Sequence, residues 1–313
     1  MNRKILINGI NGFVGKHLAR ELSRRGCIVY GLGNASNQPD DSIAQLISNY
    51  IKCDLTDQDQ VKSLNLEKID VVINLAGLAN VGESFRNPDL YMNVNTSVIS
   101  ILANELYKQN RSARLIAVSS GAVYSPTQAM PLTEQSKCHN SPSPYAASKI
   151  AMEKIAARLN IKGFDSVIVR PFNHIGPGQG LGFLIPDLIQ RIQSLQPGQS
   201  LTTGDLSTSR DFSDVRDIAC AYADIALCES LKSPVYNVCS GSALSGQKIL
   251  EIICEKLNVR LENIDVKVDD SLIRPNDPKI IIGDSRRIAK ELGWSTKIPI
   301  DQTISDILNN KRD

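Results

Sequence analysis

The segment 4–15 constrains the fold of this chain more than any other part of it. It opens with the apolar run Lys4–Asn8 and passes into three glycines at a spacing of three, Gly9, Gly12 and Gly15. Apolar residues then recur at helical spacing, at Phe13, Val14, Leu18 and Leu22. A short strand, a glycine turn and an amphipathic helix in immediate succession predict the start of a βαβ unit.

The glycine turn also has a chemical consequence. Glycines allow a tight turn and the close approach of a pyrophosphate to the first turn of a helix, where unpaired amides and the helix dipole favour anions. We therefore predict a dinucleotide site whose contacts include Gly9, Gly12, Phe13, Val14 and Gly15. A tight turn without a ligand is the alternative.

Further apolar runs continue the same alternation of strand and helix. The predicted strands are 28–32, 71–75, 115–119 and 166–170, and helical patterns cover 89–109 and 145–160. Continuous apolar strands that alternate with helices are typical of parallel sheets covered on both faces. The predicted fold class is therefore α/β, with a Rossmann-type doubly wound parallel sheet.

The bulk composition excludes several classes of function. Of 313 residues, 42% are hydrophobic and 22% are charged, and the net charge of +2 favours neither a nucleic acid nor a membrane as a partner. Seven cysteines without a C-x-x-C pair indicate reduced thiols, and three scattered histidines disfavour a metal site. With no signal-like segment and no apolar stretch of bilayer length, the chain is expected to be cytoplasmic.

Two later strand ends have residues that suit a dinucleotide. Leu75, Ala76 and Gly77 close a predicted strand and leave room for ribose and phosphates. Asp54 and Leu55 follow another predicted strand, where the carboxylate could receive the adenine amine. A helix N-cap at Asp54 is the alternative interpretation.

The end of the predicted strand 28–32 bears on the choice of cofactor. Enzymes specific for NAD place an acid there, on the ribose 2′-hydroxyl, whereas this chain has Gly33 and Asn34. A 2′-phosphate beside Asn34 would therefore meet no carboxylate, although no arginine adjoins it either. NADPH is favoured as the cofactor, with NADH as the alternative.

Tyr145 and Lys149 are four residues apart in a predicted helix, so the phenol and the ammonium share one face. A free tyrosine keeps its proton until about pH 10. A lysine charge nearby stabilises the phenolate and lowers the pKa of the tyrosine toward the working pH, where an acid–base catalyst is most useful. We predict that Tyr145 transfers a proton; an exposed helix pair is the alternative.

Four motifs follow one another in an order typical of one family. They are the glycine turn, Asn74–Gly77, Val118–Tyr124 and Tyr145-x-x-x-Lys149. With them the chain resembles the extended short-chain dehydrogenase/reductase family, which comprises nucleotide-sugar epimerases, dehydratases and reductases. Three further segments, 170–178, 209–217 and 235–241, resemble the subgroup of GDP-4-keto-6-deoxy-mannose reductases. The resemblance covers essentially the whole chain.

The resemblance implies catalytic roles for three residues. Ser120 matches the serine that hydrogen-bonds the reacting sugar oxygen. Tyr145 matches the general acid or base, and Lys149 matches the residue that lowers the tyrosine pKa and holds the nicotinamide ribose. Because all three are present, a non-catalytic binding protein of the same fold is disfavoured.

The resemblance also implies substrate contacts. Asn173 matches a contact to the nucleotide diphosphate or the sugar. Arg210 and Arg274 match two arginines that clamp the diphosphate, a task suited to a planar guanidinium. Taken singly, each arginine would be an ordinary surface charge.

The implied reaction is the NAD(P)H-dependent reduction of the C4 ketone of GDP-4-dehydro-6-deoxy-D-mannose. Its product is GDP-D-rhamnose or the C4 epimer, GDP-6-deoxy-D-talose. Dehydratases and C3/C5 epimerases need further catalytic groups directly after Ser120, where this chain has Gly121 and Ala122. His174 is a candidate proton carrier, or it fills a hydrogen-bonding slot at a strand end. A 4-epimerase with tightly bound NAD uses the same three residues and is the alternative function.

Two levels of organisation follow from the resemblance. The dinucleotide-binding domain is expected to span 1–170, with 206–235 returning to it, and a smaller C-terminal α/β substrate lobe is expected from 171–205 and 236–313. The GDP-sugar would bind in the cleft between them. The helices near 89–109 and 145–160 pair across a two-fold axis in this family, so a homodimer is expected.

Overall fold

A parallel sheet forms the centre of the protein. The structure is a computed structural model that describes residues 3–34, 38–138, 143–196, 198–273 and 277–309. Within these residues the sheet has seven strands in the order β3-β2-β1-β4-β5-β6-β10. The strands are β1 (Lys4–Asn8), β2 (Ile28–Gly33), β3 (Asn49–Lys52), β4 (Val71–Asn74), β5 (Arg114–Val118), β6 (Ser166–Pro171) and β10 (Val235–Val238). The order reverses between β1 and β4, so the predicted doubly wound sheet is confirmed.

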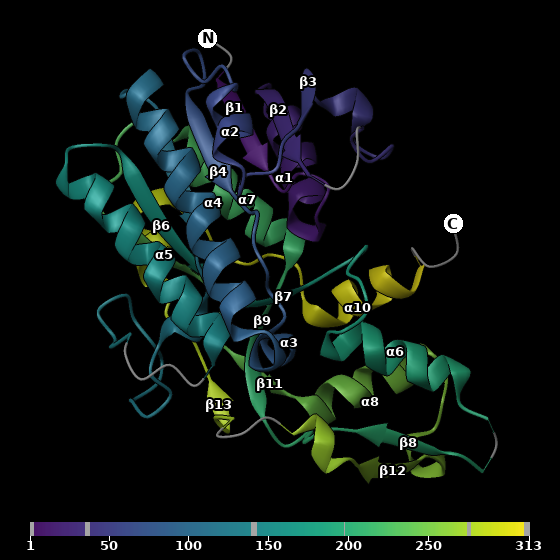
Figure 1. Ribbon diagram of the computed structural model, residues 1–313. Coiled ribbons are helices and arrows are strands. Elements are labelled where there is room, and N and C mark those ends of the chain that lie inside the picture. The colour runs from purple at the N-terminus through teal and green to yellow at the C-terminus, as the bar shows by residue number, and fades with distance from the viewer. Residues whose placement is uncertain (1–2, 35–37, 139–142, 197, 274–276, 310–313) are drawn as a thin grey trace.

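Helices cover both faces of this sheet (Figure 1). One face carries α1 (Phe13–Arg24) and α7 (Val215–Leu227), and the other carries α2 (Gln58–Lys62), α4 (Pro88–Gln109) and α5 (Pro144–Ile161). Successive side chains of a strand point to opposite faces, so Ile5 and Ile7 enter the first core while Leu6 enters the second. This double burial explains why the strands are continuously apolar.

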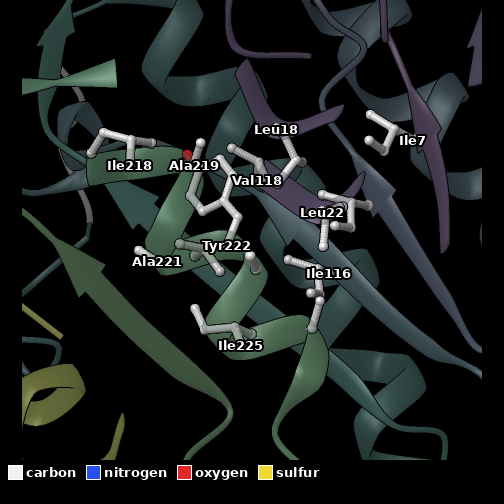
Figure 2. Packing of buried hydrophobic residues seen from close by; sticks show 14 of the residues in the cluster. Ile7, Leu18, Leu22, Ile116, Val118, Ile218, Ala219, Ala221, Tyr222 and Ile225 are labelled. Carbon is white, nitrogen blue, oxygen red and sulfur yellow. The ribbon is translucent and has the colours of Figure 1, made fainter. Parts of the chain in front are cut away.

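The core between the sheet and the pair α1/α7 is densely filled. Figure 2 shows side chains of this core, including Leu18, Leu22, Ile116, Tyr222 and Ile225. All five are fully buried. Each such aliphatic side chain stabilises the fold by about 1.5–3 kcal/mol relative to an exposed position. The core therefore holds α1, and with it the glycine turn, firmly against β1.

The second part of the chain builds a smaller group of elements, seen in the lower half of Figure 1. Its strands are β7 (Asn173–Ile175), β8 (Ser200–Thr203), β9 (Ser209–Asp214), β11 (Ala243–Ser245), β12 (Asp265–Val268) and β13 (Ile280–Ile281). Its helices are α6 (Leu184–Ser194), α8 (Gly246–Lys256) and α10 (Ile300–Asn309), which share one apolar core. The short helices α3 (Val81–Arg86) and α9 (Arg286–Leu292) belong to connections near the large sheet.

Most elements that the sequence predicted occur where expected. The predicted strands 28–32, 71–75, 115–119 and 166–170 and helices 89–109 and 145–160 agree with the structure to within one residue at each end. Late in the chain, α7 packs on α1 and β10 pairs with β6, while β9 between residues 209 and 214 belongs to the smaller part. The exact division into two domains stays a prediction.

Across the described part of the chain, no helix combines the length and apolar character needed to span a bilayer. The same residues contain no group of three or more histidine, cysteine, aspartate or glutamate side chains placed to hold a metal ion.

Candidate active site

The glycine turn lies where β1 passes into α1. Gly9 has a positive φ of +70°, and its amide donates to the carbonyl of Leu32 at 3.0 Å. A Cβ on Gly15 would lie 2.4 Å from the Gly9 carbonyl oxygen, so only glycine fits there. Gly12 is exposed at the N-cap of α1. The turn is therefore a close-packed backbone cradle in front of a helix N-terminus, which suits a pyrophosphate.

Two asparagines to which the sequence analysis gave no role lie at the point where the strand order reverses. The Oδ1 atom of Asn8, at the end of β1, accepts from the amides of Leu75 at 2.7 Å and Ala76 at 3.1 Å. Its Nδ2 atom donates to Oδ1 of Asn74. This clasp leaves Gly77 exposed, with a φ of +150°, beside the glycine turn. Buried asparagines at the ends of apolar strands were the signal that could have found it.

Asn34, a predicted cofactor contact, directly follows the end of β2 and is exposed. A cation missed by the sequence analysis approaches this region, because Nζ of Lys16 on α1 lies 3.1 Å from Oδ2 of Asp40. Hydrogen bonds from Ser42, and then Lys16, hold the pKa of Asp40 at about 2. The carboxylate beyond β2 is thus already paired with a lysine of α1.

The predicted adenine contacts lie beyond β3. Leu55 is buried, and the half-buried Asp54 accepts from the amide of Thr56 at 2.9 Å and from its hydroxyl at 2.7 Å. The N-cap of the following helix α2 is Asp57, whose side chain accepts from the amides of residues 59 and 60. The alternative interpretation of Asp54 as the N-cap is therefore wrong, while its role toward adenine stays a prediction.

The predicted catalytic residues meet at the start of α5. Ser143 caps this helix by accepting from the amide of Ala146 at 3.2 Å, and Tyr145 follows within the first turn. The side chain of Ser120, which lies just beyond β5, faces the Tyr145 hydroxyl closely enough to lower its pKa. Both Tyr145 and Lys149 are only 7% exposed, which rules out the interpretation as an exposed helix pair.

Lys149 connects α5 to the ends of two strands of the large sheet. Its Nζ atom donates to the carbonyl of Val118 at 3.0 Å. The same atom lies 3.8 Å from the place that a Cβ on Gly77 would occupy. The lysine therefore lies between Tyr145, the predicted proton donor, and the strand end predicted to face ribose.

The pKa values of the pair differ from the sequence prediction. Burial raises the pKa of Tyr145, and the side chain of Ser120 lowers it only in part. Burial lowers the pKa of Lys149 to about 8, against the opposing field of Glu153. Desolvation thus sets the direction of the tyrosine pKa shift, in place of the lowering that the lysine charge was expected to give.

His174 lies beside the glycine turn and contacts two other groups. Its ring stacks on Phe13 with centroids 6.1 Å apart, and its Nδ1 lies 2.9 Å from the carbonyl oxygen of Phe172. Burial lowers its pKa, so the imidazole is neutral near pH 7. These contacts favour the interpretation of His174 as a residue that fills a hydrogen-bonding slot.

The predicted substrate contacts come from two neighbouring strands. Asn173 begins β7 and is exposed, and β7 pairs with β9, which carries Arg210. The Arg210 guanidinium forms an ion pair with Asp277, with Nη2 and Oδ1 2.7 Å apart. Arg274, the second predicted arginine, lies outside the described residues.

A buried ion pair behind Lys149 also escaped the sequence analysis. Glu153 lies one turn beyond Lys149 on α5 and is bound by Arg170 of β6, with Nη2 and Oε2 2.6 Å apart. The spacing of four residues from Tyr145 to Lys149 to Glu153 was the available signal.

Comparisons with known proteins agree with this geometry. A family model described as GDP-mannose 4,6 dehydratase matches residues 6–307. The GDP-6-deoxy-D-mannose reductase of Pseudomonas aeruginosa is 32% identical, over 99% of this chain and 97% of its own length. A UDP-glucose 4-epimerase of Pisum sativum is 26% identical, over 98% of this chain and 95% of its own length.

Two solved structures are similar to this chain over nearly its whole length. The structure of RMD from Pseudomonas aeruginosa complexed with NADPH has a TM-score of 0.82 and 30% identity, and the match covers 99% of this chain and 98% of that one. A Thermus thermophilus UDP-glucose 4-epimerase complex with NAD has a TM-score of 0.86 and 25% identity, over 99% of both chains.

Proposed function

Because the chain belongs to the GDP-mannose 4,6 dehydratase family, within the extended short-chain dehydrogenases/reductases, we propose that it reduces the C4 ketone of a nucleotide 4-keto-6-deoxy sugar. The substrate is GDP-4-dehydro-6-deoxy-D-mannose and the product is GDP-D-rhamnose or its C4 epimer, GDP-6-deoxy-D-talose. The observation that carries this proposal is the placement of Ser120 against the hydroxyl of Tyr145, beside the buried Lys149, in a chain 32% identical to a GDP-6-deoxy-D-mannose reductase.

In this function the two hydroxyl groups act on one oxygen atom. Tyr145 donates its proton to the C4 oxygen as negative charge develops there, and Ser120 donates a hydrogen bond to the same atom. The raised pKa of Tyr145 supports this role, because the phenol then holds its proton at neutral pH. The Lys149 ammonium stabilises the tyrosinate that remains.

We propose NADPH as the cofactor, with NADH as the alternative, and bound NADPH supplies the reducing equivalent. The backbone of Gly9, Gly12 and Gly15 would hold its pyrophosphate, and Lys149 its nicotinamide ribose. Leu75, Ala76 and Gly77 would line the path between them, and Asn34, Asp54 and Leu55 the adenosine end. The absence of an acid at Gly33 and Asn34 supports NADPH, as does the neighbour solved with it.

The surroundings of Gly121 support reduction over dehydration. Gly121 is buried, and a Cβ added to it would lie 3.0 Å from the ring of Phe172. A carboxylate or thiol after Ser120 would therefore have no room without displacing that ring. Tyr145 is then the proton donor of the site, and it serves the C4 oxygen.

The alternative function is a nucleotide-sugar 4-epimerase with tightly bound NAD. It is favoured by the relatives named as UDP-glucose 4-epimerases, at 26% identity in pea. The same Ser120, Tyr145 and Lys149 would serve it, but no net consumption of cofactor would occur.

Substrate contacts, partner and location complete the proposal. Asn173, Arg210 and Arg274 would bind the diphosphate and the sugar, with the guanidinium of Arg210 exchanging Asp277 for a phosphate. A homodimer formed through α4 and α5, and a cytoplasmic location, also belong to the proposal.

One experiment separates the candidate functions. The purified protein is mixed with NADPH and GDP-4-dehydro-6-deoxy-D-mannose, and the near-ultraviolet absorbance of NADPH is followed. Stoichiometric loss of NADPH is expected, and NMR of the product then assigns the C4 configuration. Interconversion of UDP-sugars with bound NAD and no consumption of NADPH would instead establish the epimerase. Unchanged absorbance with every nucleotide 4-keto sugar offered, while NADPH binds, would contradict the reductase.

A further inference from the structure

Three side chains of α5 contact three consecutive residues at the end of β5. Tyr145 faces the side chain of Ser120, and Lys149 donates to the carbonyl of Val118 at 3.0 Å. The third contact involves Glu153, whose Oε1 accepts from the hydroxyl of Ser119 at 2.6 Å. The three positions are spaced by four residues and so form one line along the helix. The contact between the two hydroxyls of the site is thus one of three such contacts along α5.

The third member of the series is held more tightly than the other two. Arg170 of β6 donates from Nε to Oε1 of Glu153 at 2.8 Å and from Nη2 to Oε2 at 2.6 Å. Both residues are only 7% exposed. A bidentate guanidinium–carboxylate pair fixes both the position and the plane of the carboxylate. Glu153 is therefore the most rigidly placed of the three side chains.

The other end of Arg170 is fixed as well. Its Nη1 donates to the hydroxyl of Tyr124 at 3.0 Å, and its guanidinium lies 4.8 Å from the centre of the Tyr124 ring. The Tyr124 hydroxyl in turn donates to Oδ1 of Asn237 in β10 at 2.5 Å. The chain of contacts behind the catalytic helix therefore spans β5, β6 and β10.

The charge of Glu153 acts on Lys149. Its carboxylate is the one group whose field opposes the lowering of the Lys149 pKa by burial. Titratable and charged groups surround this line of residues. Arg170 contacts Glu153, Tyr124 contacts Arg170, and Cys138 lies within the field of both charges. Tyr91, with its partner Glu83, and Tyr222 lie near Tyr145. Arg170 is the cation in direct contact with Glu153. It therefore offsets part of the negative charge that keeps Lys149 protonated.

We propose that Glu153 is a positioning residue for the reaction: clamped by Arg170, it holds α5 against the end of β5 and keeps the Lys149 ammonium charged beside Tyr145. Arg170 tunes this effect, because it neutralises part of the Glu153 charge. The inference about kinetics rests on the proposed function, whereas the inference about the charge of Lys149 does not.

The first test measures the titration of Lys149 in the protein without added cofactor. Lysine labelled with 13C at Cε is followed by NMR from pH 6 to 11, and Lys149→Met identifies the signal. Glu153→Gln removes the carboxylate and leaves Arg170 uncompensated, so Lys149 should titrate about one pH unit lower or more. Arg170→Met leaves the carboxylate uncompensated, so Lys149 should titrate higher.

A matched control removes a charge next to the pair. Lys154 is exposed on the same helix, and Lys154→Gln should leave the titration of Lys149 unchanged. Opposite shifts in Glu153→Gln and Arg170→Met would support the proposal, and the double variant Glu153→Gln/Arg170→Met should fall between them. Shifts of the same sign in both single variants, or no shift in either, would overturn it. A loss of packing alone would not move the Lys149 titration in opposite directions in the two variants.

The second test uses turnover. Glu153→Gln should lower kcat by about tenfold to a hundredfold with KM for the nucleotide sugar unchanged, because the misplaced groups act on the reacting atoms. The alkaline limb of the pH–rate profile of this variant should also move to lower pH, by the same shift as the Lys149 titration. Ser119→Ala, which removes one hydrogen bond and no charge, should leave that limb in place. A rise in KM at constant kcat, or an alkaline limb that does not follow the titration, would contradict the positioning role.

Discussion

At the scale of single residues, burial acts in opposite directions on the two titratable groups of the site. It raises the pKa of Tyr145, because a phenolate would lose its hydration, and it lowers the pKa of Lys149 to about 8. The phenol is therefore kept as a proton donor at neutral pH, which is the form that ketone reduction consumes. The lysine, in contrast, is close to losing its charge just above neutral pH.

Replacement of Tyr145 by phenylalanine tests the donor directly. Turnover should fall by about 100-fold or more, the scale of a lost general acid, while NADPH still binds. Steady-state kinetics and a fluorescence titration with NADPH measure the two quantities. Tyr107→Phe removes a hydroxyl from α4 at a ring that packs on Phe164, and it should keep full activity. Near-normal turnover in Tyr145→Phe would refute the assigned role.

The shifted pKa of Lys149 also predicts how stability depends on pH. Its folded pKa of about 8 lies below the ordinary value of 10.5, so between these two values the unfolded chain binds more protons. The free energy of unfolding should therefore rise with pH across this window, by up to about 1.4 kcal/mol per pH unit from this group. Below pH 8 the cost of the buried charge is fully present, and above 10.5 it is gone.

Urea unfolding of the wild type and of Lys149→Met at pH 7, 8, 9 and 10 measures this contribution. The difference between the two proteins should shift in favour of the wild type as the pH rises. A difference that stays constant over this range would show that Lys149 is not desolvated as described.

At the scale of elements, the turn between β1 and α1 depends on backbone contacts that leave no room for a side chain. A methyl group at Gly15 would meet the carbonyl oxygens of Gly9 at 2.4 Å and of Ile10 at 2.5 Å. Both atoms belong to the backbone of the turn itself. The turn cannot relax around the methyl group without moving the amides predicted to bind pyrophosphate.

Gly15→Ala should therefore destabilise the protein by about 1–3 kcal/mol, as overpacking does, and weaken NADPH binding. Gly180→Ala is the matched control, because nothing lies within 4 Å of the added Cβ and its backbone needs no positive φ. That control should change stability by less than about 0.5 kcal/mol. Equal stability and equal NADPH affinity in the two variants would contradict the close packing of the turn.

These elements also show what the sequence could and could not predict. Apolar runs such as 71–75 and 115–119 are buried on both faces, so local pattern alone located them. The strands β7, β11 and β13 are only two or three residues long, which is too short to show a pattern, and each of them pairs with β9. The clasp of Asn8 on Leu75 and the pairing of Glu153 with Arg170 join residues far apart in sequence or buried on an otherwise apolar face. Polar residues at strand ends and the four-residue spacing on α5 marked one partner of each contact, but no local pattern identified the other partner.

At the scale of the whole molecule, α4 and α5 pack side by side over one face of the sheet (Figure 1). Met92 of α4 and Ala157 of α5 are among their exposed residues. A two-fold interface places the same patch of two copies together, so a charge introduced there meets its own copy.

We expect light scattering to give twice the mass of the chain for the wild type. Ala157→Arg should shift the protein to the monomer, whereas Ala44→Arg, at an exposed position between β2 and β3, should not. A wild type that stays monomeric at micromolar concentration would refute the expected homodimer.

The pairing of β10 with β6 has a consequence for how the protein is made. Residues 166–171 leave the ribosome long before residues 235–238, although the two segments become neighbours in the sheet. At synthesis rates of about 5–20 residues per second, the outer edge of β6 stays uncovered for several seconds. That edge is apolar and its amides and carbonyls are unpaired, which is the kind of surface that attracts another nascent chain. Translation that stalls before residue 238 should therefore yield aggregates rather than a shortened, folded domain.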